Sequence, residues 1–199
     1  MTEPGFVSGI DALLLHCAMH EVERSNAAEY RWDHAGHAIS AIVLATAPVE
    51  AHIGEWLVKP AARTHFTAEE SSRWRNASLP ATKVCKTIVQ KLHPAYDFST
   101  AQWYFRLCGL YELRNSIVHY YPDHLPVGTW PDRLEPYVTC HVFDPGGDET
   151  MDWTSRMLLA SVASQATEIA REAFHEFDQL LLVLPEVSPG QPQNLSPAS

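Results

Sequence analysis

Apolar residues recur at helical spacing through the N-terminal third of the chain. The pattern predicts a first helix with Ser8 as its N-cap, whose apolar positions include Ile10, Leu13, Leu14, Cys17 and Met19. A second helix is predicted over about residues 30–57, a stretch rich in alanine, isoleucine, valine and leucine. Pro48 lies inside this stretch and should kink or divide it, because proline cannot donate a backbone hydrogen bond.

Shorter helices are predicted in the middle of the chain. Thr67 and Glu70 have the spacing of a capping box at the start of one of them. Another begins after Ser78 and ends where Pro94 follows His93, since the residue before a proline disfavours helical backbone. Ser99, with Gln102 three residues on, opens the next helix.

A long amphipathic helix is predicted near the C-terminus, over about residues 152–184. Its buried stripe is expected to hold Met157, Val162, Ile169, Ala173, Phe177, Leu180 and Leu184. The tail of residues 185–199 is rich in proline, serine, glutamine and glycine, a composition typical of disorder. Residues 1–184 are therefore expected to form one domain.

Between the last two long helices, the pattern changes over about residues 122–150. Prolines and glycines interrupt the helical period, and Tyr137 to Phe143 has the composition of a strand. We expect a small irregular or β insertion here, with a hairpin as one form. The predicted fold is accordingly an all-α helical bundle with this insertion.

Composition narrows the class of protein. The chain has 199 residues, of which 46% are hydrophobic, enough for a single globular core. No segment is expected to span a membrane, and the N-terminus lacks the basic and apolar regions of a signal peptide. The four cysteines are far apart, which favours reduced thiols, mostly in the core, of a cytoplasmic protein. They are Cys17, Cys85, Cys108 and Cys140.

The net charge of −10 argues against indiscriminate binding to nucleic acids. Basic residues nevertheless outnumber acidic ones between Lys59 and Lys91. The candidates for contact with a phosphate backbone are Arg73, Arg75, Lys83 and Lys86. Trp74, between two arginines, is a candidate for stacking on a base. The alternatives are a solvated charged surface, and a tryptophan that anchors a loop to the core.

The helix that follows Ser99 carries the residues most suggestive of chemistry. Its apolar arc contains Trp103, Leu107, Leu110, Ile117 and Val118. Arg114 lies in the middle of this arc, where a guanidinium is costly to bury without a partner or a bound anion. Asn115 and His119 are four residues apart and share a neighbouring face. This grouping, just before Pro122, is suited to holding a phosphate and moving a proton.

These residues resemble the signature of HEPN domains, small helical bundles of prokaryotic toxins and other nucleic-acid systems. The resemblance rests on Arg-x4-His with asparagine after the arginine, in the context Glu112-Leu-Arg-Asn-x-x-Val-His119. It covers about residues 99–122. Extended to Tyr121, it also resembles the Arg-x4-His-x-Tyr toxins that are paired with nucleotidyltransferase antitoxins.

The resemblance implies a metal-independent endoribonuclease that needs no cofactor and works as a homodimer, in a toxin–antitoxin or antiviral defence setting. His119 would take the proton from a ribose 2′-hydroxyl, since histidine side chains titrate near neutral pH. Arg114 would stabilise charge on the scissile phosphate, and Asn115 would orient the imidazole or donate to the phosphate. Tyr121 would be the residue that the antitoxin modifies.

Helix geometry leaves alternatives open. Arg114 and His119 lie about 140° apart on an ideal helix. Either the helix end distorts before Pro122, or the sites of two subunits complement each other. In the non-catalytic alternative, Arg114 pairs with a buried carboxylate and His119 caps the helix C-terminus. A non-catalytic module that binds RNA, nucleotide or a protein partner is therefore the alternative function.

Other histidine clusters suggest metal sites less well. His16 and His20 are four apart on a helix, and Asp33, His34 and His37 form a second group. Neither has the glutamate of a zinc-protease helix or a cysteine pair. We expect ordinary surface or hydrogen-bonded core histidines, and no metal.

Overall fold

The computed structural model describes residues 9–76, 80–119, 125–147 and 149–182. These residues are mostly helical, which confirms the all-α prediction. The helices are α1 (Ile10–Ala27), α2 (Arg31–Val58), α3 (Pro60–His65), α4 (Ala68–Asn76), α5 (Ala81–Leu92), α6 (Gln102–Val118), α7 (Glu135–Thr139), α8 (Trp153–Met157) and α9 (Ala160–Leu182).

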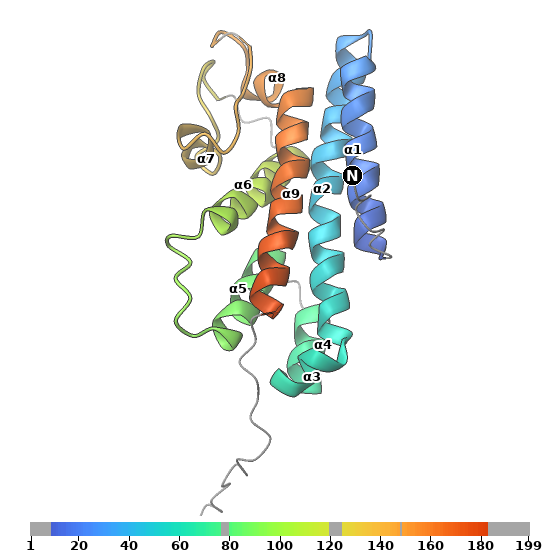
Figure 1. Ribbon diagram of the computed structural model, residues 1–199. Helices are drawn as coiled ribbons and strands as arrows, with labels where there is room; N and C mark the ends of the chain where they lie inside the picture. The colour runs from blue at the N-terminus through green and yellow to red at the C-terminus, as the bar shows by residue number, and fades with distance from the viewer. Residues whose placement is uncertain (1–8, 77–79, 120–124, 148, 183–199) are drawn as a thin grey trace, which may run out of the picture.

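Helix α2 is the centre of the bundle. It forms a long antiparallel hairpin with α1 and packs along α9, while α6 crosses behind α9 (Figure 1). Its buried face is built largely of small residues, which allow the helices to approach closely. The predicted division of the helix at Pro48 is wrong, since α2 continues through this buried proline.

Helix α1 turns much of its apolar sequence outward. Ile10, Leu13 and Met19 are exposed, although their spacing predicted the helix. The side that faces the bundle carries Ala18 together with the polar residues Asp11 and Ser25. Ser25 donates a hydrogen bond to the carbonyl oxygen of His34 at 2.9 Å, which satisfies its buried hydroxyl.

The predicted capping box at α4 is confirmed. The Thr67 backbone N–H donates to Glu70 Oε2 at 2.9 Å, and the Glu70 N–H donates to Thr67 Oγ1 at 3.1 Å. Lys91, at the end of α5, donates to Glu70 Oε1 at 2.5 Å. The hydrogen bond from Lys91 and the Thr67 backbone N–H lower the pKa of Glu70. The capping carboxylate thus also ties α4 to α5.

The strand expected over Tyr137–Phe143 is wrong. The described part of the chain contains no strand, and this segment forms the short helix α7 and a turn. Pro136 occupies the first turn of α7, where its missing N–H costs nothing. Val142 and Phe143 are buried in the bundle instead of pairing with a second strand. The insertion is therefore irregular and helical.

The long helix expected over residues 152–184 is two helices, α8 and α9. The chain bends at Leu158, which has φ −87° and ψ 55°. The Gly146 N–H donates to the Arg156 carbonyl at 3.2 Å, which supplies a partner from outside the helix near the break. The predicted stripe is otherwise confirmed, because Met157, Val162, Ile169, Ala173 and Phe177 are buried. Leu180 is half-buried, and Leu184 lies outside the described residues.

By length and composition alone, α2 is long and apolar enough to cross a membrane, a test that core helices of soluble proteins also pass. Half of its most apolar window is buried inside the bundle, as in the core helix of a soluble protein. A cytoplasmic location stays a prediction.

Candidate functional site

Helix α6 positions the candidate site at its C-terminal end. Leu107, Leu110 and Leu113 are fully buried and fix the helix against α2, α5 and α9. Gly109 lies where the Tyr137 ring of the insertion comes closest, because a Cβ there would be 2.7 Å from Tyr137 Cδ1. The signature residues follow this anchored segment.

Arg114 is half-buried, and no carboxylate among the described residues pairs with it. Its Nη1 donates to Oδ1 of Asn115 at 2.9 Å. Its Nε is buried and has no hydrogen-bond partner among the described residues, an arrangement that costs free energy unless a ligand or water supplies an acceptor. Within the same residues no ion pair forms at Arg114. The pairing with a buried carboxylate that would make it purely structural is not found there.

Glu112 is not the missing partner, although it is only two residues away. Its Oε2 is also buried without a hydrogen-bond partner in the described part of the chain. Burial raises the pKa of Tyr137 in α7, and the nearby Cys108 and Glu112 raise it further. Glu112 must be close to Tyr137 to have this effect, so it lies on the side of α6 that faces α7. Side chains two residues apart on a helix point in nearly opposite directions, so Glu112 and Arg114 do not face each other.

Arg114 lies close enough to Tyr111 to influence the pKa of its phenol. Tyr111 is buried and its hydroxyl donates to the Thr46 carbonyl oxygen of α2 at 3.2 Å. Burial raises the pKa of Tyr111 well above its usual value, the nearby Glu50 carboxylate adds to the rise, and the positive charge of Arg114 opposes it. Tyr111 therefore stays protonated and supports the α2–α6 contact.

His119 is exposed at the end of α6. Its backbone N–H donates to the Asn115 carbonyl at 2.9 Å, and its φ of −106° and ψ of 35° are not helical. Helix α6 is therefore regular through Val118 and ends at His119, which is its C-cap residue. Its imidazole forms no hydrogen bond or ion pair with the rest of the described chain, and its C-cap position also suits the capping alternative. Tyr120, Tyr121 and Pro122 lie outside the described residues.

The basic residues predicted to bind nucleic acid lie on other helices. Arg73 is exposed on α4, Lys83 is exposed on α5, and Lys86 lies over the Phe98 ring at 5.6 Å. The side chain of Arg75 is outside the described part. Over the ranges that the structure describes, no hydrogen bond joins these residues to Arg114 or His119. Trp74 packs edge-on against Phe66 at 4.9 Å, which fits the loop-anchoring alternative.

Several histidines elsewhere have structural partners or are exposed. His37 Nδ1 lies 2.7 Å from Glu21 Oε2, and His16 and His20 are exposed on α1. Within the described ranges no group of three or more histidine, cysteine or acidic side chains could hold a metal ion. The four cysteines are free, as expected for reduced thiols, but the expectation that they lie mostly in the core is wrong. Only Cys85 is buried, whereas Cys17 and Cys108 are half-buried and Cys140 is exposed.

Two features of the structure were not predicted. His52 on α2 lies between Asp11 of α1, at 2.7 Å, and Asp178 of α9, at 2.9 Å. A cleft also opens beside Trp32 at the start of α2. Asp11 and Asp178 are far apart in the sequence, so no local spacing indicated the His52 contact. In the sequence, only the position of Trp32 near the predicted start of a helix could have indicated the cleft.

Comparisons of the chain with family models, curated proteins and solved structures find no match.

Proposed function

We propose that the chain is a HEPN-like, metal-independent endoribonuclease whose site is the C-terminal end of α6. The observation that carries the proposal is the state of Arg114. Its guanidinium is half-buried and has no carboxylate partner within the described residues, and its buried Nε is unpaired five residues before an exposed histidine. An anionic ligand such as an RNA phosphate is a suitable charge partner for the accessible part of this guanidinium.

In the proposed reaction, His119 takes the proton of a ribose 2′-hydroxyl as the 2′-oxygen bonds to the adjacent phosphorus. The bond from phosphorus to the 5′-oxygen breaks, and that oxygen leaves with a proton from water. The products are a 2′,3′-cyclic phosphate and a 5′-hydroxyl. Arg114 stabilises the charge on the phosphate oxygens, and Asn115 holds the guanidinium in place.

The assembly and setting are proposed on the HEPN resemblance. Two chains pair so that both α6 ends line one cleft, and the protein acts in the cytoplasm in a defence or toxin–antitoxin role. A nucleotidyltransferase-type antitoxin would then silence it through Tyr121. Growth arrest on expression, relieved by a neighbouring gene, supports the toxin setting, whereas normal growth argues against it.

The second candidate is a module that binds RNA or nucleotide without cleaving it. Arg73 lies on α4, and Lys83 and Lys86 lie on α5, so in this candidate the cations that hold RNA are not on the helix of the signature. An unpaired guanidinium binds a phosphate whether or not a proton is transferred.

Cleavage of total RNA in the presence of a chelator tests the proposal. We expect cleavage by the wild-type protein and a loss of about 100-fold or more in His119→Ala. His20→Ala is the matched control, since His20 is exposed on α1, and it should cleave like wild type. Equal cleavage by all three proteins overturns the proposal. Binding of RNA without cleavage by wild type selects the second candidate.

A further inference from the structure

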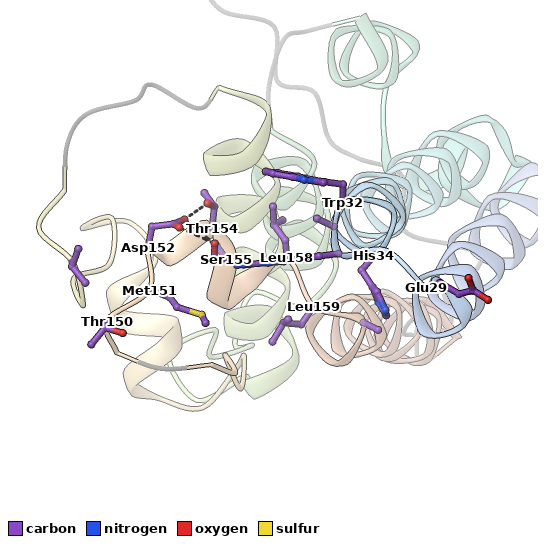
Figure 2. Close-up of a pocket in the computed structure, with 14 residues that line it drawn as sticks. Glu29, Trp32, His34, Thr150, Met151, Asp152, Thr154, Ser155, Leu158 and Leu159 are labelled. Atoms are coloured by element: carbon purple, nitrogen blue, oxygen red, sulfur yellow. Dashed lines mark hydrogen bonds between the residues drawn. The ribbon is translucent and has the colours of Figure 1, made fainter.

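A cleft of about 900 Å³ opens at the end of the bundle where α1 turns into α2 (Figure 2). One wall is the first turn of α2, with Trp32 and His34. The other wall runs from Thr150 to Ala160, and it includes α8 and the first residue of α9. A volume of this size falls within the usual range of small-molecule sites.

The cleft has an open aromatic ring opposite an apolar wall. Trp32 is 86% exposed, although tryptophan is usually well buried. Figure 2 shows its side chain extending from α2 toward the wall that carries Leu158. Within the described ranges no cation–π contact involves Trp32, so its ring is open to a ligand. Met151, Leu158 and Leu159 supply apolar surface on the facing wall, against which the hydrocarbon part of a ligand can be buried.

Carboxylates outnumber cations around this cleft. Glu29 and Asp152 line it, while Arg31 is the one arginine or lysine among the described lining residues. Asp33 and Glu149 are each next to a lining residue in the sequence, and both are exposed. The start of α9 adds only a partial positive charge. This end of the bundle is therefore negative, which attracts a cation and repels an acid.

Asp152 is ionised and has no cation beside it. Hydrogen bonds from the side chain of Thr154 and from Ser155 lower the pKa of Asp152 to about 2. The Ser155 N–H donates to Oδ1 at 3.0 Å, and the Ser155 hydroxyl donates to Oδ2 at 2.7 Å. These donors are neutral, so they orient the carboxylate without cancelling its charge. Because Asp152 forms no ion pair with any other described residue, its charge is available to a ligand.

A protonated amine with a hydrocarbon body suits all of these features, because the face of a tryptophan ring attracts a cation and a carboxylate pairs with one. We propose that this cleft binds a small organic amine in its ammonium form. The ammonium lies between the Trp32 ring and the Asp152 carboxylate, and the hydrocarbon body packs against Met151 and Leu158. The proposal does not depend on RNA cleavage, because none of the α6 signature residues lines the cleft.

Titration with two matched probes tests the proposal. The probes are 2-phenylethylammonium and 2-phenylethanol, which share a hydrocarbon body and differ in charge. Full-length protein, followed by NMR chemical shifts, should bind the ammonium with a Kd of about 1 mM or tighter, and the alcohol at least about fivefold more weakly. No binding of the ammonium, or binding of the alcohol that is equal or tighter, overturns the proposal.

Variants locate the site. Asp152→Asn should weaken ammonium binding about threefold and leave alcohol binding unchanged, since asparagine also caps a helix but carries no charge. Trp32→Ala should weaken ammonium binding about fivefold, because the cation loses the face of the ring. Unchanged ammonium binding in Asp152→Asn or in Trp32→Ala places the probe elsewhere and contradicts the proposal.

The controls remove similar groups from outside the cleft. Glu168→Gln removes an exposed carboxylate of α9, and Tyr30→Ala removes an exposed ring beside Trp32, and neither residue lines the cleft. Both variants should bind the two probes like wild type. If Glu168→Gln weakens ammonium binding as much as Asp152→Asn does, the probe responds only to the net charge of the chain, and the proposal is wrong. If Trp32→Ala melts below wild type, the result for Asp152→Asn decides.

Discussion

Arg114 Nη1 donates a hydrogen bond to Oδ1 of the adjacent Asn115, over 2.9 Å. Neighbouring residues on a helix point about 100° apart, so this bond holds the guanidinium back across the helix surface. It uses one of the five N–H donors of arginine and restrains the others. Asn115 is thus a positioning residue for Arg114.

We expect Asn115→Ala to lower kcat for RNA cleavage about tenfold while KM changes little, because the guanidinium loses its orientation and keeps its charge. Arg114→Lys should lower kcat further, since a lysine lacks the planar fork of donors. Steady-state kinetics and thermal melting of each variant check this. An unchanged kcat in Asn115→Ala, or a loss that only follows a lower Tm, would contradict a positioning role.

The contact of α6 with the insertion predicts the effect of Gly109→Ala. The added Cβ would lie 2.7 Å from the Tyr137 ring and 3.2 Å from Val142 Cγ1. We expect a lower free energy of unfolding, by about 1–3 kcal/mol, measured by urea denaturation. Gly54→Ala is the control, because nothing lies within 4 Å of a Cβ there and α2 should gain about 0.5–1 kcal/mol. A Gly109→Ala variant as stable as wild type would mean that the insertion does not pack on α6.

His52 joins three helices of the bundle. Its two ring nitrogens face Asp11 and Asp178, and its ring lies 5.0 Å from that of Phe174. Its side chain is 11% exposed and that of Asp11 is 7% exposed. His52→Gln should therefore lower the free energy of unfolding by about 2 kcal/mol.

The two carboxylates of this contact should differ in their effects. Asp178 is 52% exposed, so Asp178→Asn should cost less than about 1 kcal/mol, and less than Asp11→Asn. Chemical denaturation of the three variants, with His16→Ala as an exposed-histidine control, measures the order. An effect of Asp178→Asn larger than that of Asp11→Asn would contradict the structure.

Acid should weaken the start of α8. Hydrogen bonds from Thr154 and Ser155 lower the pKa of Asp152 from 3.8 to about 2, because they favour the carboxylate. This contribution to stability is complete above pH 3.8 and is lost as the pH falls toward 2. Asp152→Ala should cost about 1 kcal/mol at pH 7 as the N-cap is removed. The difference from wild type should shrink between pH 4 and pH 2 in melts at each pH, and a constant difference would contradict the assignment.

The sequence predicted the helices where local chemistry determines them. The reciprocal bonds of Thr67 and Glu70 and the end of α5 before Pro94 depend on neighbouring residues only. Two errors came from long-range packing. Val142 and Phe143 have the composition of a strand but are buried in a helical bundle, and burial without a partner strand does not favour extended backbone. The break at Leu158 has no proline or glycine to indicate it.

The candidate site could be predicted only as a cluster on one helix. The spacing placed Arg114, Asn115 and His119 at the end of one helix, and in the structure Arg114 and Asn115 lie on the last turns of α6 with His119 as its C-cap. The Arg114–Asn115 hydrogen bond was not predicted, because residues one apart do not face each other on an ideal helix. Apolar spacing also failed on α1, where Asp11 faces the core because His52 supplies its partner from another helix.

The chemistry of the RNA ends tests the central claim most directly. Total RNA is incubated with wild type, Arg114→Ala and His119→Ala in the presence of a chelator, and the ends of the fragments are identified. The account predicts 2′,3′-cyclic phosphate and 5′-hydroxyl ends from wild type, and at least about 100-fold fewer of them from either variant. Fragments with 3′-hydroxyl and 5′-phosphate ends, or the same fragments from all three proteins, would contradict it.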